Sequence, residues 1–165
     1  MEDAPSRKGG TAFIADAMLG SLARKLRALG FDTTYYRSGD DVGLIELAAR
    51  EDRVILTSDR SLAARSAKRR LKVILLTGGN DSARVRALAR AARPAGITLV
   101  AGDPLCSICG GGLRRLSKKE VTGHVPASVE GRHRFFFKCP VCGQIYWRGS
   151  HWKKLRLLAR QLGAK

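Results

Sequence analysis

Residues 54–68 read VILTSDRSLAARSAK, a stretch in which a strand pattern passes into a helix pattern within a few residues. Its first four residues, VILT, form the apolar and β-branched run that is typical of a buried strand. From about Ser61 to Lys68 the pattern predicts a helix. Asp59 lies at the junction, where its side chain can cap the helix or face a ligand. A strand that leads directly into a helix is one unit of an α/β fold.

The same alternation continues on both sides of this stretch. AFIA (12–15) and DTTYY (32–36) are strand patterns before it, and KVILL (72–76) is a strand pattern after it. Helical patterns separate these runs, so we expect an α/β fold with a mainly parallel central sheet flanked by helices. The other elements we expect are helices over 18–29, from Asp40 or Asp41 onward and over about 83–93, and a last short strand at ITLV (97–100).

Three segments follow from the composition. Residues 1–11 begin with the polar MEDAPSRKGG, so we expect a disordered leader. Residues 12–103 carry the α/β pattern, whereas residues 104–165 hold all four cysteines and a final helix pattern. The chain shows no apolar run near the roughly 18 residues of a membrane span, and the leader lacks the apolar core of a signal peptide. We therefore expect a cytoplasmic protein with no membrane partner.

Positive charge dominates the sequence. Lys and Arg number 31 against 14 Asp and Glu, a formal net charge of +17, and 21 of the basic residues are Arg. Because Arg suits two-point contact with phosphate, the imbalance favours a nucleic-acid partner; a solvated basic surface is the alternative. In helix 18–29, Arg24, Lys25 and Arg27 lie off the apolar stripe and predict a basic outer face. The candidates for nucleic-acid contact are Arg24, Lys25, Arg60, Arg148, His151, Lys153 and Lys154.

The four cysteines form two Cys-x-x-Cys pairs, LCSIC (105–109) and KCPVCG (138–143). Four thiolates are what a closed tetrahedral zinc site needs, so Cys106, Cys109, Cys139 and Cys142 are predicted to bind a structural Zn²⁺. Glycines after each pair allow the tight turns that direct amide groups at the sulfurs. Because the spacer is longer than the usual 15 to 20 or so residues, we expect a β-hairpin insertion in it. Two disulfides or a redox pair are the alternatives.

Aromatic and basic residues alternate near the second cysteine pair. The run YWRGSHWKK (146–154) combines rings with Arg148, Lys153 and Lys154. Such interleaving is typical of single-stranded nucleic-acid binding, in which bases stack on rings and cations contact phosphates. Alternatively, Tyr146, Trp147 and Trp152 pack the cysteine-rich segment against the first domain and the final helix.

Acidic residues are few, and five of the 14 follow or precede elements at one predicted edge of the sheet. In a parallel α/β sheet the ligand site lies beyond the carboxyl ends of the strands. Clustered carboxylates there predict a hard-oxygen site for Mg²⁺ or Mn²⁺, which can activate water and stabilise the leaving oxygen of a phosphodiester. Helix capping is the alternative for Asp41, Asp59 and Asp81, and for Asp81 we favour it. The five acids are Asp16, Asp40, Asp41, Asp59 and Asp81.

Four motifs together resemble one known family. They are D-x-M-L-G-x-L-A-R from Asp16, D-D-x-x-L from Asp40, L-T-x-D ending at Asp59, and Y-W-x-G-S-H-W from Tyr146. With the cysteine pairs, they resemble the Mut-seven C-terminal RNase domain family over about residues 12–155. The resemblance implies a PIN-like nuclease domain at 12–103 and a zinc ribbon with a C-terminal helix at 104–165.

The resemblance also implies a metal-dependent ribonuclease. Its acidic cluster maps to Asp16, Asp41 and Asp59, with Asp40 nearby and Asp81 as the candidate for a fourth acid. The leading hypothesis is an Mg²⁺- or Mn²⁺-dependent endoribonuclease whose ribbon and basic helices bind RNA. The alternative is a non-catalytic factor that binds RNA, ribosomal RNA or the ribosome through shape and charge. A phospho-receiver is a weaker alternative: Asp40, Asp41 and Asp59 imitate its acidic pocket, but this sequence lacks the Lys that such a site needs after a fifth strand.

Overall fold

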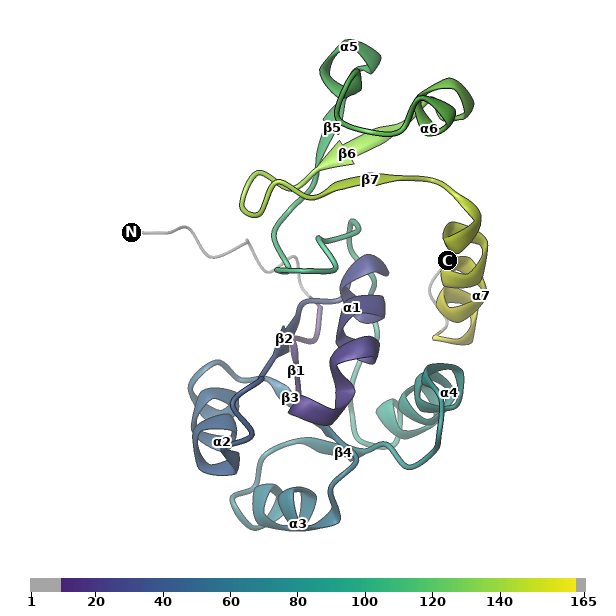
Figure 1. Cartoon of the computed structure of the whole chain (residues 1–165). Coiled ribbons are helices and arrows are strands. Elements are labelled where there is room, and N and C mark those ends of the chain that lie inside the picture. Colours follow the sequence, from purple (N-terminus) through teal and green to yellow (C-terminus); the bar gives the residue numbers. More distant parts are fainter. Residues whose placement is uncertain (1–9, 163–165) are drawn as a thin grey trace.

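The computed structural model describes residues 10–162, except for the side chains of residues 150–152. Residues 1–9 of the expected leader lie outside this range. A four-stranded sheet forms the centre of the larger domain, and each neighbouring pair of strands is parallel (Figure 1). Its spatial order is β2-β1-β3-β4. The strands are β1 (Phe13–Ala15), β2 (Thr33–Tyr35), β3 (Val54–Thr57) and β4 (Val73–Leu75). The predicted α/β class with a parallel sheet is confirmed.

Helices cover both faces of this sheet (Figure 1). On one face, α1 and α4 pack on β1 and β3 through Phe13, Leu22 and Leu88, among others. On the other face, α2 and α3 pack through residues such as Ile14 and Leu62. A short 3₁₀ turn, η1 (Ala17–Leu19), leads from β1 into the first helix. The helices are α1 (Gly20–Ala28), α2 (Asp41–Arg50), α3 (Arg60–Lys68) and α4 (Asp81–Ala92).

Two glycines allow close approaches that fix the position of α1. A Cβ on Gly20 would lie 2.8 Å from the ring of Tyr35, so only glycine lets that ring pack across the start of the helix. Gly30 ends the helix with a φ of +88°, and a Cβ there would meet the backbone of Gly102 at 2.1 Å. These contacts hold α1 against β2 and against the chain that leads to the cysteine-rich part.

A smaller antiparallel sheet of three strands, ordered β5-β6-β7, forms the ribbon (Figure 1). The expected β-hairpin in the cysteine spacer is present as the antiparallel pair β5–β6, but two short helices, which were not predicted from the sequence, form the connection between its strands. Their buried side chain Val121 packs with Leu116 and Phe136 on one face of the ribbon sheet. The elements are β5 (Arg114–Leu116), α5 (Lys118–Val121), α6 (Ala127–Arg132), β6 (Phe136–Lys138) and β7 (Ile145–Trp147).

The last helix, α7 (Ser150–Gln161), returns to the larger domain. Leu158 and Leu162 are buried in the same core cluster as α1 and α4. The ribbon is therefore held to the larger domain at both of its ends.

The expected strand at residues 97–100 is wrong, because this segment is irregular chain. Ile97 is buried in the main core, and the carbonyl of Thr98 accepts a 3.0 Å hydrogen bond from Thr11 Oγ1. Burial without strand pairing explains Ile97, whereas Val100 is 51% exposed. Within residues 10–162, no helix combines the length and hydropathy needed to cross a membrane.

Candidate active site and metal centre

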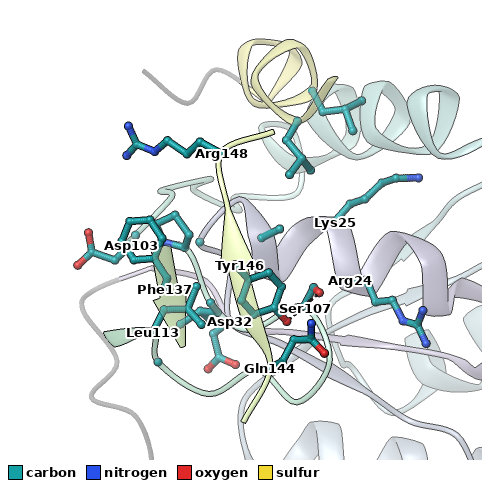
Figure 2. Close-up of a pocket in the computed structure, with 18 of the residues that line it drawn as sticks. Arg24, Lys25, Asp32, Asp103, Ser107, Leu113, Phe137, Gln144, Tyr146 and Arg148 are labelled. Atoms are coloured by element: carbon teal, nitrogen blue, oxygen red, sulfur yellow. Dashed lines mark hydrogen bonds between the residues drawn. The ribbon is translucent and has the colours of Figure 1, made fainter. Parts of the chain in front are cut away.

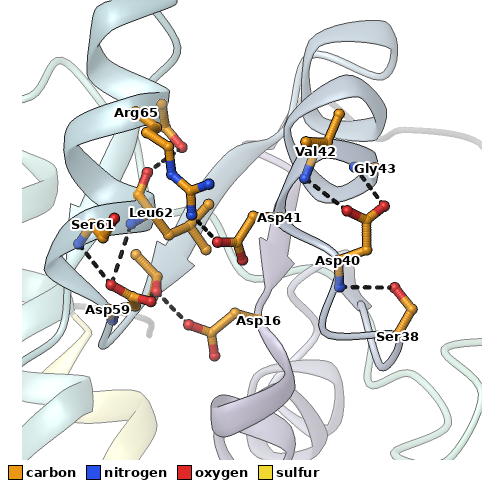
Figure 3. A network of polar contacts seen from close by, with 12 residues as sticks. Asp16, Ser38, Asp40, Asp41, Val42, Gly43, Asp59, Ser61, Leu62 and Arg65 are labelled. Atoms are coloured by element: carbon orange, nitrogen blue, oxygen red, sulfur yellow. Dashed lines mark hydrogen bonds and ion pairs between the residues drawn. The ribbon is translucent and has the colours of Figure 1, made fainter.

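Asp16 and Asp59 follow neighbouring strands at the carboxyl edge of the main sheet. Asp16 comes directly after β1, and Asp59 comes two residues after β3, which pairs with β1. The chain leaves β1 toward β2 on one side and returns to β3 on the other, so the strand order reverses here. Open α/β sheets bind ligands at such a switch point. Figure 3 shows Asp16, Asp41 and Asp59 directed toward the same region, between the N-terminal ends of α2 and α3.

Asp16 is buried, with 6% of its surface exposed. Its Oδ1 accepts a 2.9 Å hydrogen bond from the amide of Met18, which makes it the N-cap of η1. Its Oδ2 accepts hydrogen bonds from the hydroxyl of Thr57 and, at 3.3 Å, from the amide of Ser58. A buried carboxylate with neutral donors alone keeps its negative charge uncompensated, which is costly unless a cation binds.

The hydroxyl of Thr57 links the two acids. It donates to Asp16 Oδ2 and accepts a 2.9 Å hydrogen bond from the amide of Asp59. Thr57 is fully buried, so its hydroxyl has no access to water. The sequence places Thr57 beside the acids but gives no indication of this bridge.

Asp59 is exposed and is the N-cap of α3, as the alternative interpretation predicted. Both of its capping bonds, 2.6 Å from the amide of Ser61 and 3.3 Å from that of Leu62, fall on Oδ1. Oδ2 therefore accepts no hydrogen bond from a described residue. Capping and ligand binding are compatible here, because each uses a different oxygen.

Asp40 and Asp41 have separate partners. Asp40 caps α2, where its two oxygens accept from the amides of Val42 at 3.1 Å and Gly43 at 2.9 Å. In Figure 3 it points away from Asp16. Asp41 forms an ion pair with Arg65 of α3. The two residues of this pair are 24 positions apart, and the sequence holds no signal for it.

Asp81 lies in the first turn of α4 and contacts α1. The favoured capping role is wrong, because Asn80 is the N-cap and its Oδ1 accepts from the amide of Ala83. The carboxylate of Asp81 instead binds Lys25 and accepts a 2.6 Å hydrogen bond from Ser21 Oγ. Arg84 lies 3.5 Å away. Burial raises the pKa of Asp81, but hydrogen bonds from Lys25 and Ser21 and the nearby cations lower it by more, to below its usual 3.8.

Counter-charges and capping bonds divide the acids into two groups. Asp41 and Asp81 have cationic partners, whereas among the described residues no Lys, Arg or His forms an ion pair with Asp16, Asp40 or Asp59. Asp40 differs from the other two because both of its oxygens accept the capping bonds of α2. Asp16 and Asp59 are thus the two carboxylates best able to bind a divalent cation. Mg²⁺ commonly takes one or two carboxylates together with waters and phosphate oxygens. The donor set at this edge fits such an ion.

The four cysteines meet at the base of the ribbon. Within the described part of the chain, they are the only group of three or more potential ligands whose donor atoms all lie within 4.8 Å of one another. Their closest sulfurs, Cys109 to Cys139 at 3.4 Å and Cys106 to Cys142 at 3.5 Å, are too far apart for disulfides. Four sulfurs about 2.3 Å from a tetrahedral ion lie roughly 3.8 Å apart. The predicted cluster is confirmed, and it can hold a metal ion.

The surroundings of the cysteines shift their pKa values in opposite directions. Burial raises the pKa of the Cys109 thiol to about 12. Gly110 and Gly143 have φ values of +84° and +78°, as the tight turns after each pair require. Burial raises the pKa of Cys106, but hydrogen bonds from Tyr146 and from backbone amides lower it to about 6. Tyr146 Oη lies 3.0 Å from Cys106 Sγ and 3.2 Å from Ser107 Oγ. The ring of Tyr146 is therefore fixed by its hydroxyl end.

Arg27 joins α1 to the first cysteine turn. Its expected place on the basic outer face is wrong, because it is 7% exposed. Its Nε donates to the carbonyl of Thr33 at 2.7 Å, and its Nη1 donates to the carbonyl of Ile108 at 2.8 Å. A long side chain can bury its stem while its head meets several carbonyls, and helix periodicity does not reveal this.

The candidate nucleic-acid residues lie on several elements. Arg24 and Arg60 are exposed on α1 and α3, and Arg148 is exposed after β7. Lys25 is half-buried and paired with Asp81. Lys153 and Lys154 are exposed on α7, whereas the side chain of His151 lies outside the described residues. Trp147 is 39% exposed and is not core; the side chain of Trp152 also lies outside the described residues.

The model of the Mut7-C RNase domain matches residues 11–159. The chain belongs to this family. The Mut7-C match spans both the acidic edge and the cysteine cluster, and it supports a nuclease-like function that acts on RNA. No curated protein and no solved structure matches the chain significantly. The Mut7-C motifs of the sequence fall where the fold needs them, because the D-x-M-L-G motif carries Asp16 and Gly20 and the L-T-x-D motif carries Thr57 and Asp59.

Proposed function

We propose that the chain is an endoribonuclease dependent on Mg²⁺ or Mn²⁺, and that Asp16 and Asp59 hold the ion. The observation that carries this proposal is the pair of carboxylates without counter-cations, joined through Thr57 at the switch point of the sheet. The chain has a net charge of +17, so Lys and Arg are abundant and could pair with these acids. That neither acid has such a partner among the described residues is better explained by a bound cation than by a need for solubility. A bound divalent cation would make water a better nucleophile and stabilise the leaving oxygen.

The chain's own residues would divide the remaining work. Thr57 holds Asp16 in one orientation, and the amide of Ser58 adds a second donor to the same oxygen. The free Oδ2 of Asp59 faces the shared region, while its Oδ1 stays with the helix cap. Asp41 can join this set if Arg65 turns toward an incoming phosphate, because the Arg is 47% exposed and can move. Arg65 would then bind a phosphate of the substrate instead of Asp41.

The ribbon would have a structural ion. We propose that the four cysteines bind Zn²⁺, because four thiolates with amide donors are the usual structural zinc set. With all four ligand positions taken by cysteine, this ion would have no open position for substrate. Its contribution would be to folding, since the ribbon core has only three buried hydrophobic residues besides the cysteines.

Cleavage assays test the nuclease proposal directly. Labelled single-stranded and structured RNAs, incubated with the purified protein and Mg²⁺ or Mn²⁺, should be cut at internal positions. Asp16→Asn and Asp59→Asn should abolish cutting and leave RNA binding intact, whereas Glu46→Gln, an exposed acid on α2, should cut as the wild type does. Equal cleavage by the wild type and Asp16→Asn would overturn the proposal.

A non-catalytic RNA- or ribosome-binding role is the second candidate. Two observations favour it: cationic partners neutralise Asp41 and Asp81, and the acids do not form a compact group of three ligand atoms within the described residues. It predicts salt-dependent binding to RNA or ribosomes and no cleavage with any divalent ion. The same assay separates the two candidates.

A further inference from the structure

A groove of 1310 Å³ separates α1 from the ribbon and α7. It exceeds the roughly 300 to 1,000 Å³ of a small-molecule pocket. In Figure 2, β7 with Tyr146 lies beside α1, from which Arg24 and Lys25 project. The volume, and the lining by residues of α1, the ribbon and α7, favour part of a polymer over a metabolite.

One wall is a stripe along α1. Ser21, Arg24, Lys25 and Ala28 line the groove, and their spacing places them on one face of the helix. From Ser21 to Ala28 the stripe advances seven helical steps, about 10 Å along the helix axis. None of these four side chains belongs to the core, so the groove uses the face that the helix leaves uncovered.

The opposite wall is a row across the ribbon sheet. Arg115, Phe137 and Tyr146 pair across β5, β6 and β7 and therefore point to the same side. All three line the groove. In the neighbouring row, Leu116 and Phe136 are buried and pack under α5 and α6, whereas Trp147, the third member of this row, is exposed and is also among the residues that line the groove. The ribbon thus buries one face for stability and presents a cation and two rings to the groove.

The charge of the groove is positive. Five cations line it against two acids. Two of these charges have partners outside the groove: Asp32 is paired with Arg53, and Lys25 is paired with Asp81. The five cations come from α1, β5, the chain after β7, and α7, so they are distributed around the groove. They are Arg24, Lys25, Arg115, Arg148 and Lys154.

We infer that this groove binds single-stranded RNA and leads it toward the acidic edge of the main sheet; the second half of this inference rests on the proposed function. Half-buried rings that line the groove, with surrounding cations, fit unpaired bases and phosphates, whereas a duplex would keep its bases stacked away from the rings. The stripe on α1 begins at Ser21, five residues after Asp16, which caps the turn leading into α1. RNA along the stripe would therefore approach the candidate active site.

Two double variants of equal charge test the groove. Arg24→Glu with Lys154→Glu reverses two groove cations, one on α1 and one on α7. The control, Arg86→Glu with Arg156→Glu, reverses exposed cations on α4 and α7 that do not line the groove. Both pairs lower the net charge by four. The probe is a fluorescein-labelled oligouridylate, measured by anisotropy without added Mg²⁺ or Mn²⁺.

The groove variant should bind the oligouridylate more weakly than the control variant. Losing two phosphate contacts should also reduce the slope of log affinity against log salt by about 1.4. Phe137→Leu should weaken binding about fivefold or more, because a stacking ring is lost. An equivalent RNA duplex should bind the wild type more weakly than the single strand does.

Equal binding by the two double variants would overturn the inference. So would equal competition by poly-glutamate at matched charge, which would indicate an acidic protein as the partner. Binding is measured without cleavage, so the two proposals can fail separately. Loss of binding in the groove variant with no cleavage by the wild type would keep the groove and reject the nuclease. Normal binding by the groove variant, together with cleavage that depends on Asp16, would keep the nuclease and reject the groove.

Discussion

The guanidinium of Arg27 donates a 2.8 Å hydrogen bond to the carbonyl of Ile108, and so connects α1 of the larger domain to the first cysteine turn of the ribbon. The helix that carries Arg27 begins beside Asp16. One element therefore contacts the candidate active site at its start and the metal centre near its end. The orientation of α1 depends on both parts of the chain.

Arg27→Met should lower the free energy of unfolding by about 2 kcal/mol, because the carbonyls of Thr33 and Ile108 lose a charged donor in a buried place. Methionine keeps the apolar stem, so the loss reports the hydrogen bonds. Arg24→Met, on the exposed side of the same helix, should change stability by less than about 0.5 kcal/mol. Urea denaturation of the two variants makes the comparison, and equal midpoints would contradict the role of Arg27.

Removing the metal ion should unfold the ribbon and leave the main sheet folded. The ribbon core contains Leu116, Val121 and Phe136, whereas the larger domain has two clusters of its own. A structural zinc site supplies on the order of 10 kcal/mol, which this small core cannot replace. After treatment with a strong chelator, hydrogen exchange should become fast in β5 to β7 and remain slow in β1 and β3. Unchanged protection of β6 would contradict a structural ion.

The order of strands and helices could be predicted because the two hydrophobic periods are clear in residues 12–92. The meeting of Asp16 and Asp59 also followed from sequence, since parallel strands end at one edge. The spacer helices were missed, although Ser117 and Glu120 form a capping box whose S-x-x-E pattern is visible in the sequence.

Other features depend on which elements become neighbours. The pairing of Asp41 with Arg65 requires α2 beside α3, and that of Asp81 with Lys25 requires α4 beside α1. The hydrophobic pattern of one helix does not show which other helix will lie beside it, so neither ion pair could be predicted from the sequence. In the segment at 97–100 the sequence predicted an element that is absent: its apolar, β-branched run suggested a strand, but Ile97 is buried in the main core without pairing to any strand.

Asp81→Asn should destabilise the protein at neutral pH by up to about 1 kcal/mol, a small value because Lys25 is 38% exposed. The pKa of Asp81 in the folded chain lies below 3.8, so the ionised form favours folding. This contribution is complete above the unfolded pKa and is lost as pH falls through the folded one. Thermal unfolding should therefore separate wild type from variant at pH 7, and the difference should shrink as the pH falls below 3.8 and through the lowered pKa of Asp81. A constant difference across that range would show that the charge of Asp81 is not involved.

Thr57→Val should impair cleavage more than binding, because the nearly isosteric side chain removes the hydroxyl that orients Asp16. It should also lower stability by about 1 to 3 kcal/mol, since the amide of Asp59 and an oxygen of Asp16 lose a buried partner. Thr57→Ser keeps the hydroxyl, so its Mn²⁺ concentration for half-maximal cleavage should be that of the wild type. A purely structural role would lower stability in Thr57→Val but leave the Mn²⁺ concentration for half-maximal cleavage unchanged. Titration of Mn²⁺ against cleavage rate in the three proteins distinguishes these outcomes, because only a displaced Asp16 carboxylate raises the metal requirement.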